Sequence, residues 1–145
     1  MDKVIAIDPG INKCGIVIAD LEQKKVCEAL IIKSDKLSKY VKRIYQKEDH
    51  SQFLIGNGTS SKKHISELKE LIPFLIVVEE KNSTYRAKER YFEIFPLSGL
   101  KHFIPREIFI LNKNLDAVAA LIIMEDYFRC KFEMSNTINT KTWLK

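Results

Sequence analysis

Glycine and proline are both scarce in this chain. They number five and four of 145 residues, below the roughly 12% that the two together contribute to average proteins. Fibrous repeats need far more glycine, and disordered chains are typically richer in proline and polar residues. With 46% hydrophobic and 30% charged residues, the chain instead has the composition of one compact globular domain, which this length can fold without cross-links.

Long hydrophobic segments and paired cysteines are also missing. No apolar run approaches the roughly 20 residues that span a membrane, and the first four residues do not begin a signal peptide. The three cysteines, Cys14, Cys27 and Cys130, are an odd and scattered set, so they predict neither a disulfide framework nor a zinc site. These features favour a reducing, cytoplasmic location without membrane contact.

Positive charge is present in excess and is unevenly distributed. Lys and Arg number 24 against 19 Asp and Glu, which leaves a formal net charge of +5. Six cations face one acid between residues 33 and 47, and seven face three acids between residues 81 and 113. Such windows indicate either a surface for a polyanion, most simply nucleic acid, or a solvated helix face.

The hydrophobic pattern changes repeatedly between strand and helix periods. Short apolar runs bounded by turn residues predict five strands, and apolar residues three and four apart predict four helices. The expected strands are 3–8, 15–20, 26–33, 52–56 and 74–79, and the expected helices are 36–47, 62–71, 83–95 and 114–128. Because the remainder is polar and weakly patterned, we expect one domain over residues 1–128 and a polar tail over residues 129–145.

This order of elements predicts an α/β fold with a mixed five-stranded sheet flanked by helices. Short connections make the first three strands antiparallel, whereas the fourth and fifth strands follow helices and extend the sheet in parallel. The first strand is then central and lies at a switch point, where such sheets bind ligands at the carboxyl ends of their strands.

Acidic residues gather at that predicted edge. Asp8 ends the first strand, Glu79 and Glu80 end the fifth, and Asp116 begins the last helix. Each acid has a structural explanation when taken alone, because a first-turn acid complements the helix dipole and one of two adjacent glutamates faces solvent. Together they predict a metal site, and oxygen ligands without His or Cys favour Mg²⁺ or Mn²⁺.

Four motifs, in order across residues 1–128, resemble RuvC-like and YqgF-like proteins of the ribonuclease H-like superfamily. Residues 5–15 (IAIDPGINKCG) resemble the family's opening strand and turn. Residues 78–84 (VEEKNST) resemble the YqgF motif, in which an acidic pair precedes a Ser/Thr pair. Residues 115–128 (LDAVAALIIMEDYF) resemble the last helix, and residues 55–59 (IGNGT) are similar to a turn in the YqgF-like domain of Tex-type transcription accessory proteins.

The resemblance implies a ribonuclease H-like fold and a metal-dependent endonuclease. Its catalytic acids carry over to Asp8, Glu80 and Asp116, which would hold two Mg²⁺ or Mn²⁺ ions, with Glu79 as the rival of Glu80. Lys113 stands where RuvC resolvases have a fourth acid. The implied substrate is structured DNA or RNA, either a Holliday-junction-like DNA, for which a homodimer is expected, or a ribosomal RNA precursor. The alternative is a non-catalytic nucleic-acid-binding module, as in Tex-type proteins.

Polar residues beside the acids are candidate contacts to nucleic acid. Hydroxyls and backbone amides at helix starts suit a phosphate, although they serve equally as helix caps, and basic side chains suit the backbone. The candidates are Asn57, Thr59, Ser60, Lys81, Ser83, Thr84, Arg86 and Arg90. The three histidines, His50, His64 and His102, are far apart in the sequence, and we expect them on the surface. The single tryptophan, Trp143, forms no base-stacking platform by itself.

Overall fold

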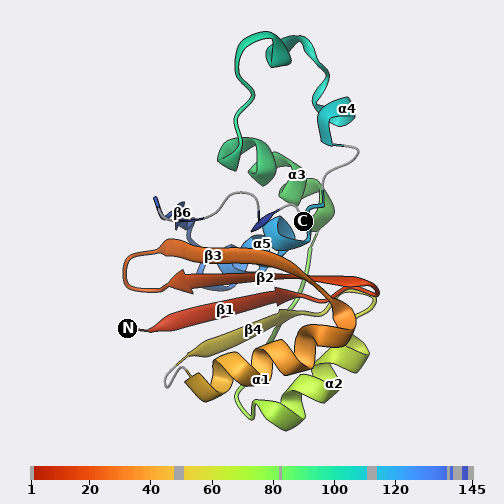
Figure 1. Ribbon diagram of the computed structural model, residues 1–145, viewed down its shortest axis with the longest axis vertical. Helices are drawn as coiled ribbons and strands as arrows, with labels where there is room; N and C mark the ends of the chain where they lie inside the picture. Colours follow the sequence, from red (N-terminus) through yellow and green to blue (C-terminus); the bar gives the residue numbers. More distant parts are fainter. Residues whose placement is uncertain are drawn as a thin grey trace.

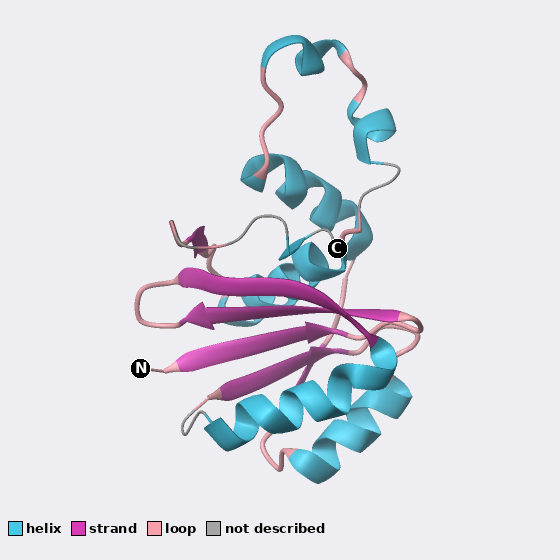
Figure 2. Ribbon diagram, viewed as in Figure 1, coloured by secondary structure: helices cyan, strands magenta, loops and turns pink. Residues whose placement is uncertain are grey.

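The computed structural model describes residues 2–47, 51–81, 83–110, 114–136, 138 and 142–143. It shows one sheet covered by helices on both faces (Figures 1 and 2). The elements follow in the order β1 (Lys3–Asp8), β2 (Lys13–Asp20), β3 (Lys25–Lys33), η1 (Ser34–Lys36), α1 (Leu37–Lys47), β4 (Gln52–Gly56), α2 (Lys62–Leu71), β5 (Ile76–Val78), α3 (Ser83–Ile94), η2 (Gly99–Phe103), α4 (Arg106–Ile110), α5 (Asp116–Phe128) and β6 (Glu133–Met134).

The strands lie in the order β5-β4-β1-β2-β3-β6. The pairs β1–β2 and β2–β3 are antiparallel, whereas β4 pairs with β1 and β5 pairs with β4 in parallel. This arrangement confirms the predicted α/β fold, with a mixed sheet flanked by helices and β1 at its centre. The strand count differs, because the sheet has six strands instead of five.

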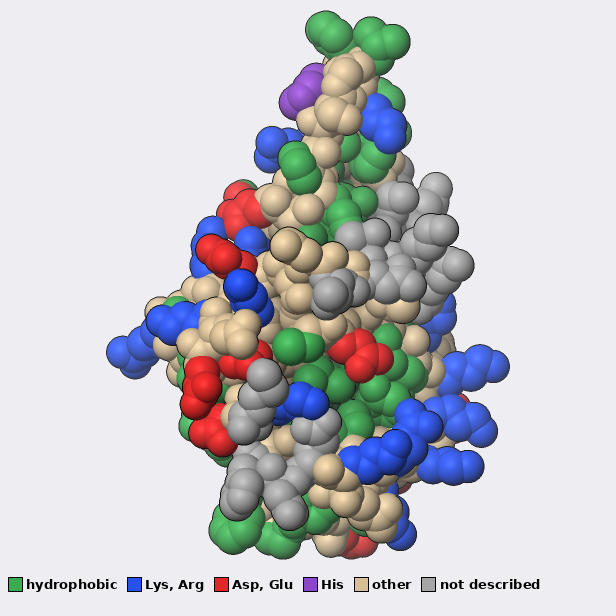
Figure 3. Space-filling model, turned by 60° about the vertical axis from the view of Figure 1, so that its left-hand side comes forward, with side chains coloured by type: hydrophobic (Ala, Val, Ile, Leu, Met, Phe, Trp, Pro, Cys, Tyr) green, Lys and Arg blue, Asp and Glu red, His purple; other side chains and the backbone are tan. Residues whose placement is uncertain are grey.

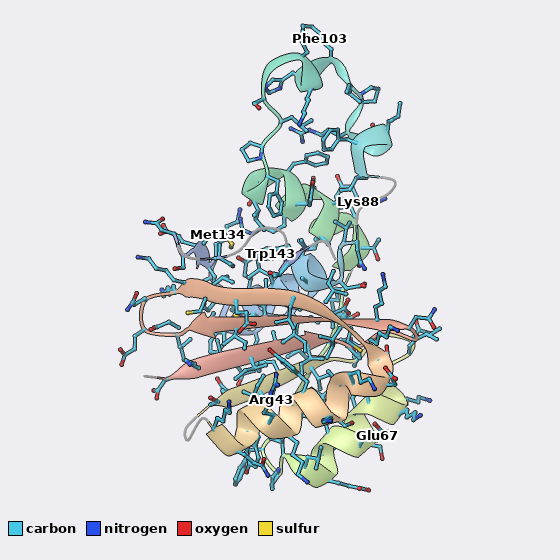
Figure 4. All side chains as sticks on the ribbon, viewed as in Figure 1. Arg43, Glu67, Lys88, Phe103, Met134 and Trp143 are labelled. Carbon is cyan, nitrogen blue, oxygen red and sulfur yellow. The ribbon has the colours of Figure 1, made fainter. Side chains whose placement is uncertain are left out.

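The sixth strand comes from the segment expected to be a polar tail. β6 pairs in parallel with β3, and the backbone N–H of Glu133 donates to the carbonyl of Lys24 at 2.9 Å. Phe132 and Trp143 are almost completely buried in the same core cluster as α5, and Met134 and Trp143 lie beyond the β3 edge in Figure 4. The described residues after 128 therefore complete one side of the core. A two-residue strand has too short a pattern to be recognised without its distant partner.

Two hydrophobic cores lie on opposite faces of the sheet. Val4 and Ala6 of β1 pack toward α5, and Ile5 and Ile7 pack toward α1 and α2. All four side chains are completely buried, which explains the uninterrupted apolar run that a central strand requires. α3 packs outside α5 as a further layer.

Two segments differ from the sequence-based expectation. β5 is shorter than predicted, because Phe74 lies in a turn with its side chain exposed and pairing begins only at Ile76. Residues 95–110, which carry η2 and α4, form an arm that projects beyond the sheet (Figure 1), with Phe103 at its tip (Figure 4) and 85% exposed. Among the described residues, no helix is long and apolar enough to cross a membrane.

Candidate active site

Side-chain alternation brings three carboxylates to one face of the sheet. On β1, Val4 and Ala6 face α5, so Asp8 at the end of the strand follows them to that side. On β5, Val78 faces α5, so the second residue beyond it, Glu80, lies on that side as well. Asp116 is the first residue of α5 itself. The parallel strands therefore deliver Asp8 and Glu80 to the edge where α5 begins.

Two glycines leave the space that the Glu80 carboxylate occupies. A Cβ at Gly56 would lie 1.9 Å from Oε1 of Glu80, and one at Gly58 would lie 2.8 Å from Oε2. Asn57, between them, accepts a hydrogen bond from the Glu80 backbone N–H through its side-chain oxygen at 3.0 Å. Its own backbone N–H donates to the carbonyl of Val78 at 3.0 Å. The Gly56–Gly58 turn therefore holds Glu80 in place, which is a role that the sequence alone did not assign to Asn57.

Glu79 and Glu80 have different environments. The Glu79 side chain is 71% exposed and forms an ion pair with Lys81 at 3.7 Å. Glu80 instead lies close enough to Asp8 for their side chains to form a hydrogen bond. The structure thus places Glu80 in the acidic cluster and its sequence rival in solvent, as alternation along an extended segment requires.

Asp116 approaches the sheet because residue 15 is a glycine. Gly15 is the register partner of Asp8, and a Cβ at Gly15 would lie only 1.8 Å from the backbone carbonyl oxygen of Asp116. The first turn of α5 therefore rests directly on β2, beside Asp8. The Asp116 N–H donates to the side-chain oxygen of Asn114 at 3.3 Å, and this contact begins the helix.

Burial perturbs all three carboxylates, and Asp8 is perturbed most because its two neighbours add to the effect. Burial, together with the nearby charges of Glu80 and Asp116, raises the pKa of Asp8 from 3.8 to about 8. Burial also raises the pKa of Glu80 and of Asp116, although Lys13 and Asn114 partly offset the rise at Asp116. Asp8 therefore keeps a proton at neutral pH unless a cation is present.

The cluster has the donor chemistry of a divalent cation site. Oε1 of Glu80 is buried and has no hydrogen-bond donor among the described residues, and carboxylate oxygens are the ligands that Mg²⁺ and Mn²⁺ prefer. Over the same residues, no group of three or more His, Cys, Asp or Glu side chains already has the spacing of a metal site. The Asp8–Glu80 pair is therefore the part of the cluster that fits a cation, with Asp116 beside it.

Two of the predicted nucleic-acid contacts, Arg90 and Arg86, form ion pairs with acids of α5. The Arg90 side chain is 12% exposed and donates to both carboxylate oxygens of Glu125, at 2.8 and 3.2 Å, and to the carbonyl of Phe132 at 2.8 Å. Arg86 makes two hydrogen bonds to Asp126, at 2.5 and 2.6 Å. Both guanidinium groups therefore join α3 to α5 in this structure, and their contact with nucleic acid stays a prediction. Glu125, an acid within the apolar helix α5, is the feature of the sequence that indicates a buried basic partner.

The remaining predicted contacts stay near the site but are not all described. Thr59 and Thr84 are exposed, Ser60 is partly exposed, and Lys81 is engaged with Glu79. The residue preceding α2 is Ser61, which makes no side-chain capping bond, so neither Thr59 nor Ser60 holds the capping position that was the alternative to a phosphate contact. The Ser83 side chain, Lys113 and His50 lie outside the described part of the structure.

His64 was expected on the surface but is buried. Its Nε2 atom lies 3.2 Å from the carbonyl oxygen of Gly10, to which the hydroxyl of Ser34 also donates at 2.8 Å. These two side chains come from α2 and η1 and fix the turn that follows Asp8. Nothing in the sequence pattern indicated this, since the contacts span 24 and 54 residues.

Comparisons with known proteins give a distant structural similarity. No protein-family model and no curated protein matches the chain. Among solved structures, the chain is similar to T. thermophilus RuvC in complex with Holliday junction substrate, with 14% sequence identity and a TM-score of 0.47. The match covers 89% of this chain and 96% of that chain. At this identity and TM-score the likeness carries no argument about the chain's family or activity.

Proposed function

We propose that this protein is a Mg²⁺- or Mn²⁺-dependent endonuclease of the RuvC-like and YqgF-like type, which hydrolyses phosphodiester bonds in structured nucleic acid. The observation that carries the proposal is the Asp8–Glu80–Asp116 cluster at the carboxyl edge of the sheet. Burial and the two neighbouring carboxylates raise the pKa of Asp8 to about 8, and Oε1 of Glu80 is buried without a donor among the described residues. A protein that only bound nucleic acid would gain nothing from three half-buried acids, because they repel phosphate.

Each acid has a distinct part in this proposal. Asp8 and Glu80 would hold the cation, and Asp116 would act as a further ligand from the start of α5. Two ions with Asp8 as their common ligand remain a prediction. When bound, such ions reverse the negative potential of the cluster, activate water and stabilise the leaving oxygen.

The protein's own groups would position the substrate. Lys13 already lowers the pKa of Asp116, so its positive charge lies next to the cluster, where it would meet a phosphate. The exposed Thr59 and the partly exposed Ser60 present hydroxyls beside the Gly56–Gly58 turn. The turn after Asp8, fixed by His64 and Ser34, would keep the carboxylate from moving when substrate binds.

A cleavage panel would test the proposal. Labelled four-way DNA junctions, DNA duplexes, single strands and precursor-like RNA are incubated with the protein and Mn²⁺. Cleavage of at least one substrate is expected for the wild type and for Glu79→Gln, and is expected to be lost in Asp8→Asn and in Glu80→Gln. Glu79→Gln and Glu80→Gln make the same chemical change at adjacent positions. A loss of cleavage in Glu79→Gln with full activity in Glu80→Gln would therefore refute the assigned site. The same panel would distinguish a junction substrate from an RNA precursor substrate. The protein is expected to be a homodimer if the junction is its substrate.

A further inference from the structure

The outward face of α1 concentrates positive charge. We define the α1 basic face as Lys36, Lys39, Lys42 and Arg43, all of which are exposed. Helix α1 contains no acidic residue, and its buried positions, Leu37 and Val41, lie on the opposite side, against the sheet. Figure 3 shows Lys and Arg side chains gathered at its lower right, at the level of α1, and Figure 4 places Arg43 on this helix.

Little of this charge is neutralised within the protein. Lys36 lies 3.7 Å from Asp35, but both side chains are largely exposed, so the pair is weak. No described carboxylate lies within ion-pair distance of Lys39, Lys42 or Arg43. The carboxylates that reach α1 from neighbouring elements are Glu67, which accepts from the Ser38 hydroxyl at 3.0 Å, and Glu28, whose charge helps to raise the pKa of Tyr40.

The second basic window, residues 81–113, is partly neutralised within the protein. Its arginines on α3, Arg86 and Arg90, are bound to acids of α5 and do not present free charge. The sequence places that window closer to the acidic residues, which favours it as the main contact for a polyanion. Lys88, Lys101 and Arg106 of this window remain exposed, but they are dispersed over α3, η2 and α4, whereas the cations of α1 share one helix face.

The arrangement of the α1 basic face suits a phosphate backbone. Lys36 and Arg43 are seven residues apart, which is about 10 Å along a helix, or about three phosphates of one duplex strand. The Arg43 guanidinium lies over the Tyr40 ring, 5.1 Å from its centroid, and this stack holds a planar donor that binds phosphate oxygens in pairs. A hollow of about 420 Å³ opens between the side chains of Lys36, Lys39, Tyr40, Lys42, Arg43 and Gln46.

The α1 basic face begins at the same edge as the acidic cluster. β3 runs parallel to β1, so its end at Lys33 lies at the edge where Asp8 lies, and α1 follows through η1. Lys33 is the register partner of Lys13, the residue whose charge reaches Asp116. Exposed cations therefore run from Lys13 beside Asp116, over the end of the β2–β3 pair, to α1, which covers the face of the sheet opposite to α5.

We propose that the α1 basic face is an anchoring surface for the sugar-phosphate backbone of the same nucleic-acid molecule that the acidic cluster would cleave. It would hold a segment on one side of the scissile bond without reading its sequence, since lysine and arginine contacts to phosphate carry no base information. The inference rests on the proposed function for the identity of the polyanion. The free charge of α1 and its link to the acidic edge are independent of catalysis.

Charge-matched variants test this surface. Lys39→Gln/Lys42→Gln/Arg43→Gln removes three charges from α1, and Lys62→Gln/Lys63→Gln/Lys69→Gln removes three from exposed positions on the neighbouring helix α2. Binding of a labelled DNA duplex, a four-way junction and an RNA hairpin is measured by fluorescence anisotropy in Ca²⁺, over a series of salt concentrations. The α1 variant is expected to bind at least about tenfold more weakly and to lower the salt slope by about 2–3, and the α2 variant is expected to change affinity less than about threefold.

Several outcomes would overturn the proposal. Equal losses in the two variants would mean that only net charge matters, and no loss in the α1 variant would mean that the face makes no contact. Binding of the wild type to phosphatidylserine vesicles, with no salt-dependent affinity for any nucleic acid, would assign the face to a membrane. Cleavage in Mn²⁺ separates the two proposals: α1-dependent binding without cleavage refutes the nuclease and supports the anchor, whereas cleavage with unchanged binding by the α1 variant refutes the anchor alone.

Discussion

Replacing Asp8 by Asn is expected to make the metal-free protein more stable at neutral and alkaline pH. Burial and two neighbouring carboxylates raise the pKa of Asp8 from 3.8 to about 8 in the folded protein. A raised pKa means that the native state binds the proton more tightly than the unfolded chain. The resulting stabilisation is complete below about pH 4 and is lost progressively as the pH rises toward 8.

The structure sets the size of this effect. Between the two pKa values the free energy of unfolding falls by about 1.4 kcal/mol per pH unit through this one group. Asn cannot ionise, so the variant lacks that slope. Relative to the wild type, Asp8→Asn is expected to gain about 4 kcal/mol between about pH 5 and about pH 8.

Urea denaturation in the presence of EDTA measures this difference. Trp143 is the only tryptophan and is completely buried, so its fluorescence reports unfolding directly. Glu79→Gln is the control. Because the Glu79 carboxylate is exposed, this substitution is expected to leave the pH dependence of the unfolding free energy unchanged. A stability difference between Asp8→Asn and the wild type that stays constant over this pH range would refute the raised pKa of Asp8.

Adding Mn²⁺ supplies an independent measurement on the same proteins. A cation that binds only the native state stabilises it by about 2.7 kcal/mol at a hundredfold excess over its Kd. This stabilisation is expected in the wild type at about pH 8 and is expected to be largely absent in Asp8→Asn. Equal stabilisation of the two proteins would place the cation elsewhere.

Three further predictions concern the packing around the site. Gly15→Ala should drive a Cβ into the Asp116 carbonyl and cost at least about 2 kcal/mol, with weaker Mn²⁺ binding in calorimetry; unchanged stability would contradict the close approach of α5 to β2. Arg90→Leu should cost about 3–5 kcal/mol in urea denaturation because it leaves Glu125 buried without its partner, and the double variant with Glu125→Leu should recover most of this loss. Trp143→Ala should cost about 3–5 kcal/mol in thermal unfolding followed by circular dichroism, and a negligible change would mean that the segment after residue 128 is dispensable for the core.

Most of the sheet could be predicted from local sequence. The apolar run of β1 ends at Asp8 and is followed by Pro9 and Gly10, and both signals are contained within a few residues. The short connections among β1, β2 and β3 require antiparallel pairing, and the helices before β4 and β5 allow parallel pairing. These rules also bring the acidic strand ends to one edge, which is why the carboxylate cluster was predictable.

Contacts between distant residues decided the rest. β6 forms by pairing with β3, and Trp143 is buried in the hydrophobic core that contains α5. Neither contact can be predicted from the local hydrophobic pattern. The same holds for His64, whose ring reaches the Gly10 carbonyl across 54 residues.

The two basic windows show the same division most clearly. The sequence determined how many cations each window carries, and on that basis alone the two were nearly equivalent. Only the tertiary structure decided which charges remain free, because α5 places Glu125 and Asp126 against Arg90 and Arg86, whereas no described carboxylate lies within ion-pair distance of Arg43. An ion pair forms only where two elements pack together in space, and the composition of a segment does not determine that packing.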